Sequence, residues 1–134
     1  MYDENRLELV LMLLRVSVFA VMLVWTIDKF VNPAHGAAVF SHFYGIDGLS
    51  AQSMQIIAVL ELIILAGFIT GLFKTFTYGA VLIFHAVSTL SSWNIYMQPF
   101  AENHLLFFAA WPMLAACLGL FLLRDSDTLL SLGK

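Results

Sequence analysis

Apolar residues along the chain group into four long runs, and most polar residues lie between these runs. The runs cover residues 9–27, 53–73, 75–93 and 105–123. Each is close to the roughly 20 residues that an α-helix needs to cross the hydrocarbon core of a bilayer. The pattern therefore predicts an all-α integral membrane protein, a four-helix bundle formed by a single domain over residues 1–134.

The connections between the runs differ in length. Little more than Lys74 separates the second run from the third, which predicts an antiparallel pair of helices. Residues 28–52 are long enough to hold a short helix that Pro33 would begin and that Gly45 and Gly48 would end. Its apolar and polar residues separate onto two faces. We expect an amphipathic helix in this external loop, lying in the membrane interface or against the mouth of the bundle.

Composition supports a membrane protein and excludes other classes. The chain is 61% hydrophobic and 11% charged, whereas a soluble domain has about 25% charged residues. Six Lys and Arg against nine Asp and Glu give a net charge of -3, and without a basic tract nucleic acid is not an expected partner. The single cysteine, Cys117, leaves neither an internal disulfide nor a thiolate zinc site, and we expect it to be a small buried hydrophobe.

Basic residues near the helix ends predict the orientation of the chain. Four of them, Arg6, Lys74, Arg124 and Lys134, fall on one side of the predicted topology, and Lys29 lies on the other. Because Lys and Arg accumulate in cytoplasmic loops, we expect both termini in the cytoplasm and a multi-pass protein of a bacterial inner membrane. The aromatic belt of the outer interface would consist of Trp25, Tyr44, Trp93 and Tyr96.

Three polar side chains fall inside the predicted spans. Counted along the helices, Glu61 and His85 lie near the bilayer midplane and Arg15 lies somewhat closer to the cytoplasmic side. Such residues are costly in a membrane and often functional, so the three could form one cluster that binds a ligand or carries a proton. The alternative is structural: Arg15 and Glu61 pair and hold two helices in register, or Arg15 extends to the inner interface.

The other histidines do not form a metal-binding motif. His35 and His42 are seven residues apart, so their side chains lie two helical turns from each other, too far for joint ligation of one ion. We therefore predict no metal site, and no haem bound within this chain. A periplasmic copper site would have to recruit His35, His42 or His104 together with Met54 or Met97.

Two local features bear on how the helices pack. Gly67 and Gly71 have the spacing of a GxxxG motif, which lets a neighbouring helix approach closely. We expect it to mark close packing of the second predicted helix on the third. Pro112 lies inside the last apolar run and predicts a kink near Trp111.

Short motifs give the chain a resemblance to a known family. Residues 28–33 read Asp-Lys-Phe-Val-Asn-Pro, Glu61 and Gly67 follow in the second run, residues 71–74 read Gly-Leu-Phe-Lys, and Glu-Asn occupies 102–103. This succession resembles the DoxX-like four-helix membrane proteins. The resemblance implies cytoplasmic termini and a link to membrane redox systems, which include a subunit of thiosulfate:quinone oxidoreductase. It also marks Lys29, Pro33, Glu61 and Asn103 as pattern positions without assigning them catalysis.

Two functions remain open on the sequence. The first is a subunit or accessory protein of a quinone-linked redox assembly in the membrane. It would have no catalytic activity alone, would bind no cofactor by itself and could contact a quinone. The second is a small-solute or proton-coupled transporter that uses Arg15, Glu61 and His85. In both cases we expect the partners to be the lipid bilayer and either other membrane subunits or further copies of this chain.

Overall fold

The computed structural model describes residues 3–133, and within them the chain is all-α, without a β-strand. The long helices are α1 (Glu4–Val31), α3 (Ala51–Thr70), α4 (Lys74–Ser91) and α6 (Ala110–Leu122). Shorter helical segments are α2 (Pro33–Tyr44), α5 (Trp93–Tyr96) and the 3-10 helices η1 (Leu105–Ala109) and η2 (Arg124–Ser126). The predicted fold class is confirmed at this level.

Capping side chains and glycines set the helix ends. Asp3 accepts a hydrogen bond from the backbone N–H of Asn5 at the start of α1, which satisfies a free donor of the first turn. The short helix expected in the first long connection is present as α2. It begins at Pro33, and Gly45 follows it with a φ of 69°, a left-handed conformation that glycine adopts without steric cost.

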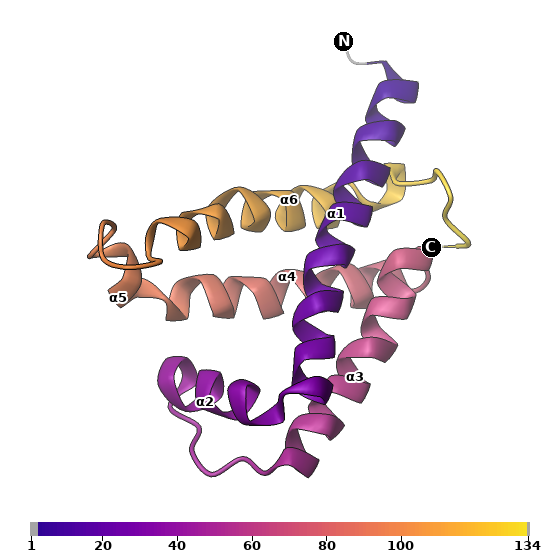
Figure 1. The fold of residues 1–134 in the computed structure, drawn as a ribbon. Helices are drawn as coiled ribbons and strands as arrows, with labels where there is room; N and C mark the ends of the chain where they lie inside the picture. The colour runs from indigo at the N-terminus through magenta and orange to yellow at the C-terminus, as the bar shows by residue number, and fades with distance from the viewer. Residues whose placement is uncertain (1–2, 134) are drawn as a thin grey trace.

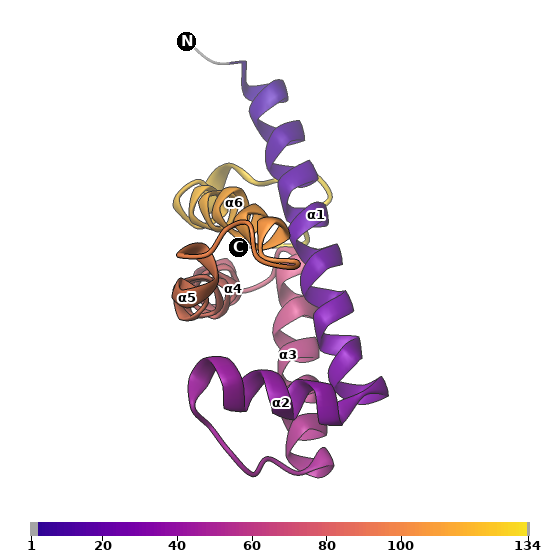
Figure 2. The ribbon, with the colours of Figure 1, turned by 60° about the vertical axis from the view of Figure 1, so that its left-hand side comes forward.

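The four long helices form two pairs that are steeply inclined to each other (Figure 1). In one pair α1 lies along α3, and in the other α4 lies along α6. In the view turned by 60°, α1 and α3 still run from top to bottom, whereas α4 and α6 are seen nearly end-on (Figure 2). The pairs diverge from the turn between α3 and α4, so the molecule is more open than a bundle of nearly parallel helices.

A close approach between two helices holds this turn together. A Cβ atom added to Gly67 would lie 2.7 Å from Cγ2 of Thr77, so the glycine lets α3 and α4 come together as the sequence predicts. Gly71 has a different role, because its φ of 75° ends α3. Apolar side chains from all four long helices form the core near this turn: Leu11, Val18, Met22, Leu65, Phe68, Tyr78, Val81, Cys117 and Leu120.

The last apolar run folds as two kinds of helix. Residues Leu105–Ala109 form the 3-10 helix η1, and the α-helix begins only at Ala110. Pro112 is therefore in the first turn of α6. Backbone N–H groups there have no partner within the helix, so the N–H that proline lacks costs no hydrogen bond. The predicted kink within one continuous helix is replaced by this change of helix type.

Within residues 3–133, three helical segments are long and apolar enough to cross a membrane: Glu4–Val31, Ala51–Thr70 and Leu105–Leu122. Few of their residues are buried inside the structure, which suits a lipid environment and suggests a multi-pass membrane protein. The helix α4 does not reach this level of apolarity. It begins with Lys74 and carries His85 and several threonines and serines.

Candidate functional site

A buried ion pair lies at the end of the molecule where α3 turns into α4. It joins Arg15 of α1 to Asp127 in the segment after α6, with 3.2 Å between Nη1 and Oδ1. Their side chains are 1% and 0% exposed. Arg15 Nη2 also donates to the carbonyl oxygens of Leu129 at 2.6 Å and Leu130 at 3.2 Å. These hydrogen bonds add to the ion pair and help to compensate for the cost of burying the guanidinium.

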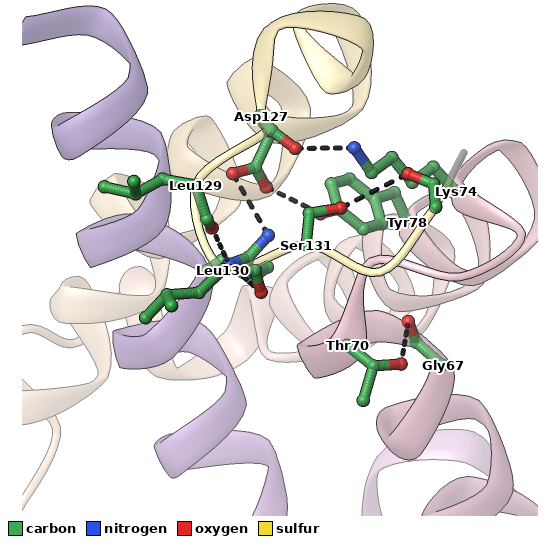
Figure 3. A network of polar contacts seen from close by, with 10 residues as sticks. Gly67, Thr70, Lys74, Tyr78, Asp127, Leu129, Leu130 and Ser131 are labelled. Atoms are coloured by element: carbon green, nitrogen blue, oxygen red, sulfur yellow. Dashed lines mark hydrogen bonds and ion pairs between the residues drawn. The ribbon is translucent and has the colours of Figure 1, made fainter. Parts of the chain in front are cut away.

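Further polar groups surround Asp127 (Figure 3). Tyr78 Oη donates to Oδ2 of Asp127 at 2.6 Å, and Lys74 Nζ donates to its backbone oxygen at 2.5 Å. The backbone N–H of Leu132 donates to the carbonyl oxygen of Thr70, 2.7 Å away, near the end of α3. The segment after α6 is thus fastened to α1, α3 and α4.

Arg15 and Glu61 do not form the pair that the sequence offers as one structural alternative. Arg15 pairs with Asp127, and Glu61 pairs with Lys29. The sequence pairs these residues by their depth along the predicted helices. That count leaves out residues after the last helix, such as Asp127, which fold back onto the helices. Arg15 nevertheless has a structural role, because its side chain links α1 to the C-terminal segment. Its partner there is Asp127 and not Glu61.

Glu61 belongs to a second polar group, between α1 and α3. Its Oε1 lies 3.1 Å from Lys29 Nζ, and its Oε2 accepts a hydrogen bond from Thr26 Oγ1 at 3.0 Å. The Lys29 and Glu61 side chains are 13% and 16% exposed. This pair is therefore partly accessible, whereas the pair formed by Arg15 and Asp127 is closed off.

His85 of α4 is buried between the two helix pairs. Its Nε2 lies 2.9 Å from the carbonyl oxygen of Ala110 and 3.2 Å from Thr89 Oγ1. The other ring nitrogen, Nδ1, is buried without a hydrogen-bond partner among the described residues. The indole of Trp25 stacks on the imidazole with 6.0 Å between ring centroids. An orphaned buried polar atom of this kind requires an explanation.

Two cavities meet at Trp25 and His85. The first, of about 590 Å³, lies between α1, α4 and α6, and the second, of about 690 Å³, lies between α1, α2, α3 and α4. Trp25, His85 and Ser88 line both cavities. The Lys29–Glu61 pair lines the second. Both volumes are within the range of roughly 300–1,000 Å³ found for small-molecule sites, and both linings are mainly apolar with a few polar groups, as such sites require.

Comparisons with known proteins do not identify the chain. No protein-family model, curated protein or solved structure matches it. The chemistry of the cavities therefore has to be argued from their own residues.

The remaining histidines lie apart from one another. His35 Nδ1 is 2.6 Å from Asp28 Oδ2, and His104 Nδ1 is 2.7 Å from the carbonyl oxygen of Gln98. The ring of His42 packs edge-on against Phe43. Over residues 3–133, no group of three or more His, Cys, Asp or Glu side chains has the arrangement of a metal site.

The pattern positions of the family resemblance occupy distinct structural roles. Lys29 and Glu61 form the ion pair at the second cavity. Pro33 is the first residue of α2. Asn103 has a φ of 65° in the turn before η1, a left-handed conformation that asparagine tolerates better than most residues.

Sequence reasoning missed Lys74, Tyr78 and Asp127, which form the closed polar cluster with Arg15. Asp127 resembles an ordinary charge in a terminal segment, and no nearby motif distinguishes it. A signal existed for Arg15: a buried arginine requires an acidic partner, and Asp127 is one of the nine acidic residues of the chain. The second omission is the contact of Trp25, which the sequence assigns to the aromatic belt, with His85, on whose ring it stacks.

Proposed function

We propose that the chain is a DoxX-like protein of a bacterial inner membrane, with four spans and both termini in the cytoplasm. Support for this orientation comes from the distribution of basic residues. Arg124 Nε donates to Thr75 Oγ1 at 3.2 Å. Since Lys74 precedes Thr75 in the chain, Arg124 and Lys74 belong to the same end of the molecule. The steep inclination of the pairs requires tilted helices, and tilts up to about 40° occur in membrane proteins.

Within this topology, the function we propose is that of a quinone-contacting subunit of a membrane redox assembly. The observation that carries it is the pair of cavities that meet at Trp25 and His85. An aromatic side chain for stacking and a few polar groups for orientation suit a flat ring with oxygen substituents. The electron carriers of such an assembly would belong to partner subunits, and this chain would hold and orient the ring.

Binding of a short-tailed benzoquinone to the purified protein in lipid nanodiscs tests this function. We expect saturable quenching of tryptophan fluorescence. The variant Ser88→Phe places a large ring where the two cavities meet, and should weaken binding at least tenfold, about 1.4 kcal/mol. Ile83→Phe is the matched control, because Ile83 lies on the same helix and is exposed outside both cavities. Equal binding by both variants, or no saturable binding, would refute the proposal.

The redox assembly requires partner subunits, which a separate experiment detects. Purification in a mild detergent followed by native mass spectrometry should recover the chain with other membrane proteins. A stable monomer without a partner would count against a subunit role and leave quinone binding to be judged by the fluorescence titration.

A proton-coupled transporter is the second candidate, because Glu61 and His85 line the same cavity. Arg15, which the sequence groups with them, is held in the closed cluster. In proteoliposomes, Glu61→Gln should abolish a proton-linked flux if this function is correct, while Asp47→Asn, in the loop after α2, should leave it intact. Wild-type vesicles without solute or proton flux would eliminate this candidate.

A further inference from the structure

The two nitrogens of His85 differ in what they can do for a ligand. The carbonyl oxygen of Ala110 can only accept a hydrogen bond, and it lies 2.9 Å from Nε2. Nε2 must therefore carry the ring proton. Among residues 3–133 no carboxylate forms an ion pair with His85, and a buried ring without such a partner carries one proton only. Nδ1 is then an acceptor and has no donor to offer.

The other polar side chains that line the first cavity do not share this restriction. They are Ser17, Ser88, Ser92 and Tyr96, and each carries a hydroxyl group that can donate or accept a hydrogen bond. Tyr96 Oη is buried without a hydrogen-bond partner in the part of the chain that the structure describes, as Nδ1 of His85 is. These hydroxyls would serve a carbonyl and a hydroxyl on a ligand equally well. Discrimination between the two therefore falls to His85.

We propose that the first cavity prefers a ring that bears a hydroxyl group, such as a quinol or another phenol, to the corresponding carbonyl or ether. His85 Nδ1 accepts the hydrogen bond from that hydroxyl. A carbonyl oxygen in the same place would oppose the lone pair of Nδ1 and leave this buried nitrogen unpaired. The inference rests on the proposed function and specifies which redox form of the ring the site holds.

Trp25 is the neighbour of His85 that has room to move when such a ring binds. Its indole stacks on the imidazole and is 44% exposed, whereas His85 is 1% exposed. We infer that movement of this partly exposed indole opens space for a ligand beside the imidazole, because both side chains line the two cavities. Because Trp25 lies against the imidazole, its fluorescence should report the arrival of the ligand.

A phenol and its methyl ether with the same alkyl tail separate hydrogen bonding from hydrophobic burial. The probes are 4-nonylphenol and 4-nonylanisole, both redox-stable, titrated into the wild-type protein in lipid nanodiscs. We expect the phenol to bind at least tenfold more tightly than the ether. In ¹⁵N-histidine-labelled protein, the Nδ1 resonance of His85 should move upfield with the phenol and not with the ether.

Two variants connect this preference to Nδ1. His85→Phe removes the acceptor, so the phenol and the ether should bind this variant with about equal affinity. Thr89→Val removes the hydroxyl beside Nε2 and leaves Nδ1 in place, so it should keep the preference. If His85→Phe does not fold, the wild-type affinities and the Nδ1 shift decide alone.

The outcomes separate the inference from the function on which it rests. Equal binding of phenol and ether to the wild type, with an unmoved Nδ1 resonance, would overturn the hydroxyl preference and leave quinone binding standing. A preference that persists in His85→Phe would also overturn it, because another group would then be the acceptor. Failure of both probes and of the benzoquinone to bind would refute the cavity as a site altogether.

Discussion

At the scale of single residues, Arg15 determines how the closed end of the molecule is held. A guanidinium that is 1% exposed requires charge compensation, and Asp127 provides it together with two backbone carbonyls. The Lys29–Glu61 pair is partly exposed and contributes less. Among the ion pairs of residues 3–133, only the one between Arg15 and Asp127 is fully buried, and it joins the first helix to the C-terminal segment.

Replacing one partner of this pair should destabilise the protein strongly. Arg15→Leu leaves the Asp127 carboxylate buried and uncompensated, and should lower the free energy of unfolding by about 3–5 kcal/mol. Asp127→Leu should have a similar effect for the converse reason. The double variant should lose much less than the sum, with a coupling of at least about 1 kcal/mol. Reversible unfolding in mixed detergent micelles, followed by circular dichroism, measures all four proteins.

Glu61→Gln provides the control for this cycle. Glu61 does not contact Arg15, so its effect should add to that of Arg15→Leu within about 0.5 kcal/mol. Coupling between Arg15 and Glu61, together with additive effects of Arg15 and Asp127, would show that Arg15 pairs with Glu61 and not with Asp127.

The polar residues show where sequence reasoning reaches its limit. The sequence identifies Arg15, Glu61 and His85 as buried or partly buried groups, because charge inside an apolar run is visible in one dimension. It does not identify their partners. Asp127 lies 112 residues from Arg15 in the chain, counted from the two residue numbers, and only folding back of the terminal segment brings them together.

At the scale of helices, hydrophobic runs and turn residues predicted most of the elements. The four apolar runs correspond to α1, α3, α4 and the combined η1 and α6, and Pro33 and Gly45 locate α2. The inclination between the two helix pairs was not predictable, because lipid-facing and core-facing residues are both apolar. In a soluble protein the spacing of apolar residues shows which face of a helix packs against the core. In this chain that spacing is a weak signal.

The contact at Gly67 is the element-scale feature that a substitution can test most directly. Gly67→Ala should lower the free energy of unfolding by about 1–3 kcal/mol, because its Cβ would lie 2.7 Å from Thr77 Cγ2. Thr77→Ser removes that methyl group and keeps the hydroxyl that donates to Leu72. In this background Gly67→Ala should be neutral or slightly stabilising. Thermal unfolding in detergent compares the four proteins.

Gly119→Ala is the matched control for helix propensity. A Cβ atom at Gly119 meets nothing within 4 Å, so alanine there should stabilise α6 by up to about 1 kcal/mol. If Gly67→Ala behaves like Gly119→Ala in the wild-type background, α3 and α4 are not in the close contact described.

At the scale of the whole molecule, one closed end and one open end determine what the protein can do. The Arg15–Asp127 cluster and the turn at Gly71 hold the pairs together at one end, and the cavities lie where the pairs diverge. The apolar side chains of α2 face this opening, since Phe40, Phe43 and Tyr44 line the second cavity. A ligand from the lipid phase could enter between the pairs without disturbing the closed end.

The proposed topology can be tested by labelling single cysteines with a membrane-impermeant maleimide. In a Cys117→Ala background, Asp47→Cys and Phe100→Cys should be labelled in intact cells, whereas Asn5→Cys and Phe73→Cys should need permeabilised cells. Phe73 and Phe100 are 74% and 91% exposed and precede and follow α4. They lie on opposite sides only if α4 crosses the membrane. Labelling of both from the same side would mean three spans, which places the N-terminus and the C-terminal segment on opposite sides of the bilayer.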